Sequence, residues 1–122
     1  MPVLEVDIVG ELDPVARKGI AARLADVVGH ALRSRPGGTW VKVTLIPRGL
    51  YAENAGGPEP GVLPVFVRLL SREVPEGEAL AAQVRDLTRA VALVCGRPET
   101  HVHVLYEPPA KGRLAFGGKL VD

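Results

Sequence analysis

The sequence PVLEVDIV at residues 2–9 predicts a β-strand almost at the start of the chain. Leu4, Val6 and Ile8 alternate with two acidic residues, and alternation with a period of two is typical of a strand that buries one face. We therefore expect a half-buried strand at residues 3–9, and we interpret the following segments from this starting point.

A helix is expected after this strand. Asp13-Pro14 provides an N-cap and a first helical residue, and Pro36-Gly37-Gly38 ends the helical pattern. Between them, apolar residues recur at helical spacing: Ile20, Leu24, Val27, Val28 and Ala31. A second strand is predicted from Thr39 to Ile46. The first half is thus a β-α-β unit, whose two strands are normally parallel.

The second half has the same order of predicted elements. A strand spans residues 64–70, an apolar helical stripe runs from Leu80 to Val94, Gly96 provides a C-cap, and a last strand covers residues 101–106. Thr100-x-Val102-x-Val104 matches the pattern Thr-x-Val-x-Val at residues 39–43. Matches of this kind indicate an internal repeat.

We interpret the chain, residues 1–122, as a single domain made of two β-α-β repeats, about residues 2–57 and 64–118. In this interpretation Pro64-Val65 matches Pro2-Val3, and residues 58–63 form the linker. The predicted fold class is α+β (a two-layer α/β arrangement), with a four-stranded mixed sheet and two helices on one face.

The other face of that sheet is expected to be buried by a symmetric oligomer. Depending on register it carries apolar residues such as Val3, Trp40 or Phe66, which are poorly suited to water. The tail from Gly112 to Val121 has the glycine pair of a hairpin, and we expect this arm to reach onto a neighbouring subunit.

Composition and charge argue against several classes of function. The formal net charge of +1 lacks the excess that non-specific binding to nucleic acid or anionic membranes requires, so neither partner is expected. No apolar run approaches the roughly 18 residues of a membrane span, and the acidic start is unlike a signal peptide, which predicts a cytoplasmic protein. The single Cys95 is interpreted as a core residue. The histidines lack ligand spacing, so no metal or cofactor is expected.

A proline after the initiator methionine, a strand starting there, the β-α-β duplication and the segment GRLAFGGKL at residues 112–120 together resemble the tautomerase superfamily. The resemblance covers nearly the whole chain. Superfamily members include 4-oxalocrotonate tautomerase, 5-carboxymethyl-2-hydroxymuconate isomerase and macrophage migration inhibitory factor (MIF), and this chain is similar to the longer, two-unit forms. The resemblance implies a tautomerase/MIF-like fold, a homotrimer with pockets between subunits, and an isomerase acting on a small carboxylate or enol substrate.

The resemblance also implies that Pro2 is the catalytic residue. Removal of Met1 leaves a secondary amine at Pro2. An ordinary α-amino group has a pKa near ~8, and an apolar pocket or neighbouring cations lower the pKa of such an amine. A neutral amine is a general base that can move a proton between the atoms of a keto-enol pair. Pro64 has an internal imide nitrogen without basicity, so one site per chain is expected.

Cations must stabilise the enolate and bind carboxylates. Arg68 and Arg72 are the first candidates, because the resemblance implies that this region supplies arginines to the proline. They have alternative interpretations, an ion pair across the sheet for Arg68 and a solvated strand end for Arg72. Lys42 and His103 occupy equivalent positions in the two units, where short tautomerases have a substrate-binding arginine, although His103 could instead pack at the trimer contact.

The remaining candidates are apolar, apart from one further cation. Trp40 and Phe116 are expected to form walls of the pocket, with core packing as the alternative for Trp40, and Arg113 is a further substrate cation. Dehalogenase or hydratase chemistry needs a carboxylate that activates water, and residues 114–116 contain none. This favours tautomerase chemistry. A dehalogenase-like or decarboxylase activity and a non-catalytic trimeric binding protein remain the alternatives.

Overall fold

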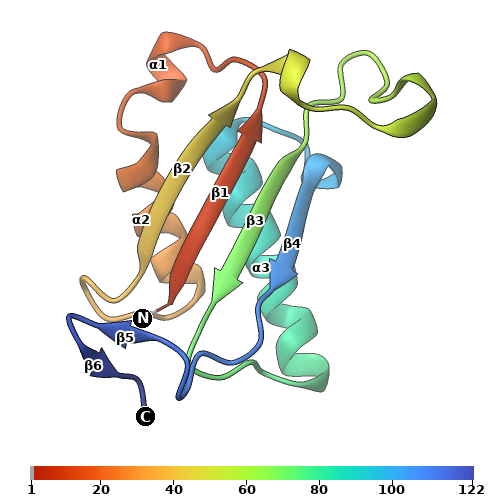
Figure 1. Cartoon of the computed structure of the whole chain (residues 1–122). Helices are drawn as coiled ribbons and strands as arrows, with labels where there is room; N and C mark the ends of the chain where they lie inside the picture. Colours follow the sequence, from red (N-terminus) through yellow and green to blue (C-terminus); the bar gives the residue numbers. More distant parts are fainter. Residues whose placement is uncertain (1) are drawn as a thin grey trace.

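A four-stranded sheet forms one layer of the molecule, and helices cover one of its faces (Figure 1). The structure is a computed structural model that describes residues 2–122. Its main elements in chain order are β1 (Val3–Val9), α1 (Pro14–Arg17), α2 (Ile20–Ala31), β2 (Trp40–Ile46), β3 (Val65–Leu70), α3 (Gly77–Cys95), β4 (Val102–Tyr106), β5 (Ala115–Phe116) and β6 (Lys119–Leu120). Short 3-10 turns lie at Arg48–Leu50, Asn54–Gly56 and Glu99–His101.

The sheet has the strand order β2-β1-β3-β4. β1 is parallel to β2, β3 is parallel to β4, and the two pairs meet through the antiparallel contact of β1 with β3. The predicted fold class, a mixed four-stranded sheet with both long helices on one face, is therefore confirmed.

The register of the sheet relates its two halves. Glu5 pairs with Lys42, and Phe66 pairs with His103, which is the same shift in both strands (5 to 66 and 42 to 103). The sequence comparison had matched Pro64 with residue 2. The burial pattern favours a shift of 61 instead, because Val65, Val67 and Leu69 are buried like the residues 61 positions earlier, Leu4, Val6 and Ile8. With this shift Pro64 aligns with residue 3, since a strand shifted by one residue exchanges its two faces.

The first predicted helix is interrupted. α1 begins with the expected cap, in which the Val15 amide donates to the Asp13 carboxylate at 2.8 Å. The chain then leaves the helix at Lys18, which is extended, and at Gly19, which has a φ of 65°. Glycine adopts positive φ without a steric penalty, so the break occurs where the sequence permits it. The helix resumes as α2 and ends at Ala31.

The core lies between the sheet and the helices. Leu4, Val6 and Ile8 of β1 are fully buried, as the alternation predicted. Cys95 is also in this core at 3% exposure, and burial raises the pKa of its thiol to about 11. None of the helices within residues 2–122 is long and apolar enough to cross a membrane.

The C-terminal segment forms the predicted hairpin. β5 and β6 are antiparallel and are joined by Gly117 and Gly118, whose φ values are 55° and 89°. Two consecutive positive φ values are typical of a tight hairpin turn. Figure 1 shows this hairpin beside the start of β1. Its proposed contact with a neighbouring subunit remains a prediction.

Candidate active site

Pro2 lies directly before β1, and its side chain is buried. Its carbonyl oxygen accepts a hydrogen bond of 3.0 Å from the backbone amide of Trp40, which continues the pairing of β1 with β2 by one residue. Because residues two apart share a face of a strand, Pro2 lies on the same side of the sheet as buried Leu4. The predicted amine also requires removal of Met1, which lies outside the described residues.

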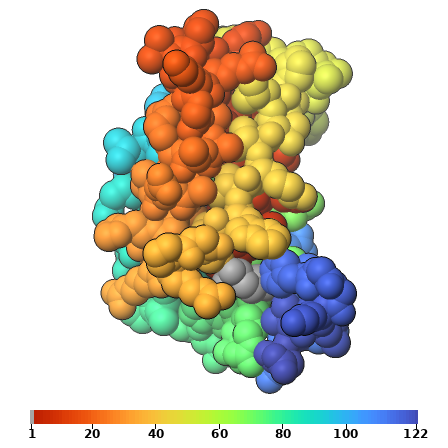
Figure 2. All heavy atoms as spheres, turned by 90° about the vertical axis from the view of Figure 1, so that its left-hand side faces the viewer, coloured from red at the N-terminus to blue at the C-terminus, as the bar shows by residue number. Residues whose placement is uncertain are grey.

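A hollow of about 450 Å³ lies beside Pro2, and we call it the Pro2 hollow. Its walls come from the turn at residues 32–38 (the α2–β2 turn), from the segment at residues 69–75, and from Gln83 of α3. The space-filling view in Figure 2 shows the α2–β2 turn and the chain after β3 close together at one end of the molecule, next to the C-terminal hairpin. The fold thus places Pro2 beside the α2–β2 turn and the segment at residues 69–75, which are distant from it in the sequence.

Arg72 is the one of the two first-choice arginines that lines the Pro2 hollow. Its Nε atom donates to the backbone oxygen of Asp122, and its Nη1 atom lies 3.8 Å from a carboxylate oxygen of Glu73. Both contacts are at the surface, where such an ion pair is weak. Arg72 therefore lines the hollow while its guanidinium contacts Glu73 and Asp122 at the surface.

Two cations of the hollow were missed by the sequence analysis. Arg33 and Arg35 line it from the α2–β2 turn. The signal was present in the Arg-Ser-Arg run at residues 33–35, between the end of α2 and the start of β2. Because this run follows the helix, its position relative to Pro2 depends on how the turn folds, which hydrophobic periodicity does not specify.

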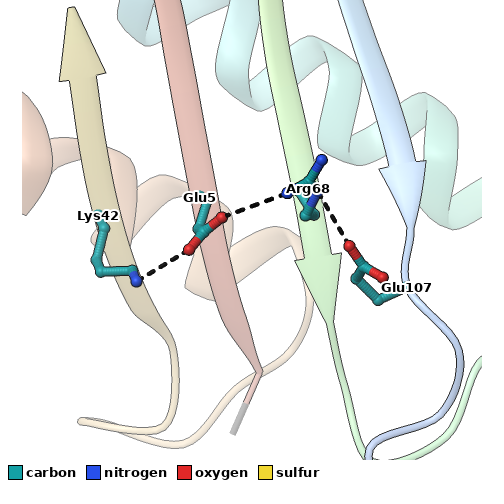
Figure 3. A network of polar contacts seen from close by, with 4 residues as sticks. All are labelled: Glu5, Lys42, Arg68 and Glu107. Atoms are coloured by element: carbon teal, nitrogen blue, oxygen red, sulfur yellow. Dashed lines mark ion pairs between the residues drawn. The ribbon is translucent and has the colours of Figure 1, made fainter.

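Arg68 and Lys42 lie instead on the face of the sheet that carries no helix, which we call the open face (Figure 3). Lys42 Nζ is 2.9 Å from Glu5, and Arg68 lies 3.8 Å from Glu5 and 3.0 Å from Glu107. The hydrogen bond from Lys42 is the main cause that lowers the pKa of Glu5. The structure thus shows the ion pair across the sheet that was the alternative interpretation of Arg68.

The other predicted residues are also on or near the open face. The ring of His103 is 5.4 Å from that of Phe66, and the two line a smaller hollow of about 240 Å³ together with Arg68. Trp40 and Phe116 contact each other edge to face, with ring centroids 4.8 Å apart. The fold therefore brings Arg72 to Pro2, joins Trp40 to Phe116, and keeps the remaining candidates on the other side of the sheet.

Arg113, the last of the predicted cations, also lies away from Pro2. It lines a shallow depression of about 280 Å³ with Val3, Glu5 and Arg68, and it does not line the Pro2 hollow. Within one protomer it is therefore a cation of the open face.

Solved structures with the same arrangement are known. The wild-type symmetric trimer of a fused 4-OT is 20% identical, with 98% of this chain and 94% of that chain covered and a TM-score of 0.74. FG41 malonate semialdehyde decarboxylase, inhibited by 3-bromopropiolate, is 14% identical, with 94% and 88% covered and a TM-score of 0.70. A macrophage migration inhibitory factor-like protein from Entamoeba histolytica is 10% identical, with 98% and 97% covered and a TM-score of 0.70.

No protein-family model and no curated protein sequence matches the chain. The likeness to the solved structures rests on the backbone, because the identities are 20% or lower. It extends over both β-α-β halves and the C-terminal hairpin, since nearly all of the chain is covered. The chain therefore has the fold of the tautomerase superfamily over nearly its whole length.

Proposed function

We propose that this protein is an isomerase that uses Pro2 as a general base for keto-enol or double-bond isomerisation of a small 2-oxo or 2-hydroxy acid. The observation that carries the proposal is the position of Pro2, which is buried at the edge of a hollow of about 450 Å³ that also contains Arg72. A base beside an open, cationic space is the arrangement that proton transfer on an anionic substrate requires.

The chemistry follows from the state of the Pro2 nitrogen. After removal of Met1, this nitrogen is a secondary amine at the start of β1. Cations that line the hollow disfavour a further positive charge, so they lower the pKa of the amine and keep it neutral. The neutral amine takes a proton from the enol oxygen or from the carbon next to the carbonyl, and returns it to the other position. Arg72 binds the substrate's carboxylate or stabilises the enolate oxygen.

The proposal includes a homotrimer. The open face carries large apolar side chains that no helix covers, among them Trp40 at 52% and Leu105 at 55% exposure. A symmetric assembly buries such a face. In a trimer, Arg68, Lys42 and His103 would lie near a neighbouring subunit and would contribute to a pocket shared between subunits, with Trp40 and Phe116 as its apolar wall. The wild-type fused 4-OT structure with the same fold is a symmetric trimer.

Intact mass and a substrate panel test this function together. We expect a mass without Met1 and activity on phenylenolpyruvate or 2-hydroxymuconate. A titration of the ¹⁵N-labelled Pro2 amine should give a pKa below the ordinary value of about 8. Activity on malonate semialdehyde alone would identify a decarboxylase. A retained Met1 would exclude the mechanism, because Pro2 would then have an amide nitrogen, and an ordinary pKa without turnover would support a binding protein.

A further inference from the structure

We propose that Gln83 of α3 determines which substrates the Pro2 hollow accepts, by donating an amide hydrogen bond to a hydroxyl group that the substrate carries in addition to its carboxylate and enol. Tyr106 of β4 is the positioning residue that holds the Gln83 amide in place. This inference rests on the proposed function, because it concerns the specificity of the same site. The sequence analysis named neither residue as part of that site.

Gln83 is a polar residue on the side of α3 that packs against the sheet. It lies three residues after Leu80 and four residues before the fully buried Leu87, and residues three or four apart share one face of a helix. Its side chain is partly buried, and it is the residue through which α3 lines the Pro2 hollow. A polar group at such a position normally has a specific partner, because burying an unpaired polar group is unfavourable.

Tyr106 is this partner. Its hydroxyl donates to the side-chain oxygen of Gln83 at 2.7 Å. Tyr106 ends β4 and pairs with Leu69 of β3, which itself lines the hollow. Burial raises the pKa of Tyr106, so its hydroxyl stays protonated and remains a donor at neutral pH. The oxygen of the Gln83 amide is therefore occupied, and the hydrogen bond orients the amide group.

The nitrogen of the same amide has no hydrogen-bond partner among residues 2–122. It is also not enclosed by protein atoms, because within these residues the buried side-chain atom without a partner is Nδ1 of His101. An amide nitrogen carries two hydrogen atoms that can donate. Because Gln83 lines the Pro2 hollow, this donor is available to a molecule that enters the hollow.

A hydroxyl group is the ligand chemistry that suits this donor. The amide is uncharged, and the carboxylate of Glu73, which also lines the hollow, repels a second anionic group. The substrate's carboxylate is bound better by a charged donor such as Arg72. A site that donates a hydrogen bond to a substrate hydroxyl discriminates against the analogue without it, because the donor of the protein is then left without a partner.

Two substrates that differ by one hydroxyl group test this assignment, phenylenolpyruvate and 4-hydroxyphenylenolpyruvate. We expect the wild type to have a KM about 3- to 10-fold lower for the hydroxylated substrate, which is the usual effect of one neutral hydrogen bond. Gln83→Met has a similar length and no amide, so it should remove this preference and change kcat for phenylenolpyruvate less than about threefold. Tyr106→Phe should reduce the preference to about twofold, because the amide loses its orientation.

Tyr51→Phe is the matched control for Tyr106→Phe. The Tyr51 hydroxyl donates to Glu53 at 2.7 Å, and Tyr51 does not line the Pro2 hollow. This variant should keep the wild-type preference. Thermal unfolding identifies a purely structural role of Gln83. If Gln83→Met lowers the midpoint of unfolding and leaves the preference for the hydroxylated substrate unchanged, Gln83 serves only as the partner of Tyr106 and the proposal is wrong.

Cinnamate and 4-hydroxycinnamate do not interconvert between keto and enol forms, so their binding separates this inference from the proposed function. Calorimetry should show a lower Kd for the hydroxylated acid in the wild type and equal Kd values in Gln83→Met. If the wild type turns over neither enol while this change in binding occurs, the function fails and the inference stands. If turnover depends on Pro2 and Gln83→Met keeps the wild-type preference in KM and Kd, the inference fails. A wild type with no preference in either measurement also overturns it.

Discussion

The Pro2 hollow and the open face both present arginine side chains, but the two surfaces differ in how their charges are balanced. On the open face, Lys42 and Arg68 alternate with Glu5 and Glu107 in one row across the sheet (Figure 3). In the hollow, the arginines of the α2–β2 turn contact no carboxylate of the described chain. Within one protomer, an anion that approaches the open face therefore competes with protein carboxylates for the cations, whereas an anion at the turn does not.

The difference in charge balance affects how easily each cation can bind an anion. Each exposed ion pair contributes little to stability, about 0–1 kcal/mol. A substrate that binds Arg68 must nevertheless compete with two carboxylates of the same chain. No such competition exists at Arg33 or Arg35, so the same guanidinium group is a better anion receptor in the hollow than on the open face within one protomer.

The largest expected effect is at Pro2. Pro2→Ala still permits removal of Met1 but replaces a constrained secondary amine with a flexible primary one. We expect kcat for phenylenolpyruvate to fall about 10²- to 10⁴-fold, which is the usual contribution of a positioned general base. Steady-state kinetics measures the loss. Sedimentation should show the same assembly as the wild type. A rate within about threefold of wild type would mean that another group moves the proton.

The second effect concerns the apolar part of the open face. Leu105 is 55% exposed in the protomer and pairs with Arg68 in the register of β3 and β4. Leu105→Lys introduces a charge next to Arg68 on a face that the trimer would bury. We expect the trimer to dissociate at micromolar concentration, because an unpaired charge at an interface costs several kcal/mol. Analytical ultracentrifugation measures the change.

The control for that experiment is Val15→Lys. Val15 is 81% exposed on α1, away from the sheet, so this variant should sediment like the wild type. Trimers in both variants would show that the open face is not the interface. A monomeric wild type would exclude the trimer itself.

The sequence predicted the fold better than the site, for a physical reason. Burial repeats at regular positions along a strand or helix, so it leaves a local pattern in the sequence. The pattern is visible in the alternation of Leu4, Val6 and Ile8 and in the apolar stripe of α3. The break at Gly19 was missed because a single glycine inside a periodic pattern has little influence on the period. The fold class followed from the order of these elements, while their exact bounds differed by a few residues.

The charges of the site depend on tertiary register instead. Arg68 faces Glu5 only because β1 and β3 pair in one particular register, and nothing local to either strand specifies that contact. In the same way, Arg33 and Arg35 reach the Pro2 hollow through the path of a turn. Arg72 was found because the resemblance pointed to its region. Sequence periodicity therefore predicts which elements form the sheet and which form the helices. Whether a given cation is free to bind a substrate can be judged only from the three-dimensional structure.

A comparison of Arg72→Ala with Arg68→Ala gives the third effect. Arg72 lines the hollow with Pro2, whereas Arg68 is held by two carboxylates on the other side of the sheet. For a dianionic substrate such as 2-hydroxymuconate, we expect Arg72→Ala to raise KM about tenfold and Arg68→Ala about threefold at most. Equal losses in both variants would mean that Arg68 binds the substrate as strongly as Arg72 in spite of its two carboxylate partners.

The smallest expected effect is the contribution to stability of the ion pairs among Lys42, Glu5, Arg68 and Glu107 on the open face. Lys42 and Arg68 hold the pKa of Glu5 below its ordinary value of 4.5, so ionised Glu5 is stabilised in the folded state. This contribution is fully present above pH 4.5 and is lost as the pH falls through the lowered pKa. Glu5→Gln should therefore reduce the free energy of unfolding by about 0.5 kcal/mol at pH 7, because the pair is exposed and screened by solvent.

Urea unfolding of the Glu5→Gln variant and the wild type at one fixed protomer concentration measures this difference, since assembly adds a concentration-dependent term. The difference should shrink as the pH is lowered from 7 through the lowered pKa of Glu5, because protonated Glu5 resembles the neutral glutamine. A matched variant, Glu11→Gln, removes the partner of Arg48 on another part of the surface and should behave alike if only a weak ion pair is involved. A difference for Glu5→Gln that persists unchanged at low pH would mean that the side chain stabilises the open face through packing, and the contrast between balanced and unbalanced charges would lose its electrostatic basis.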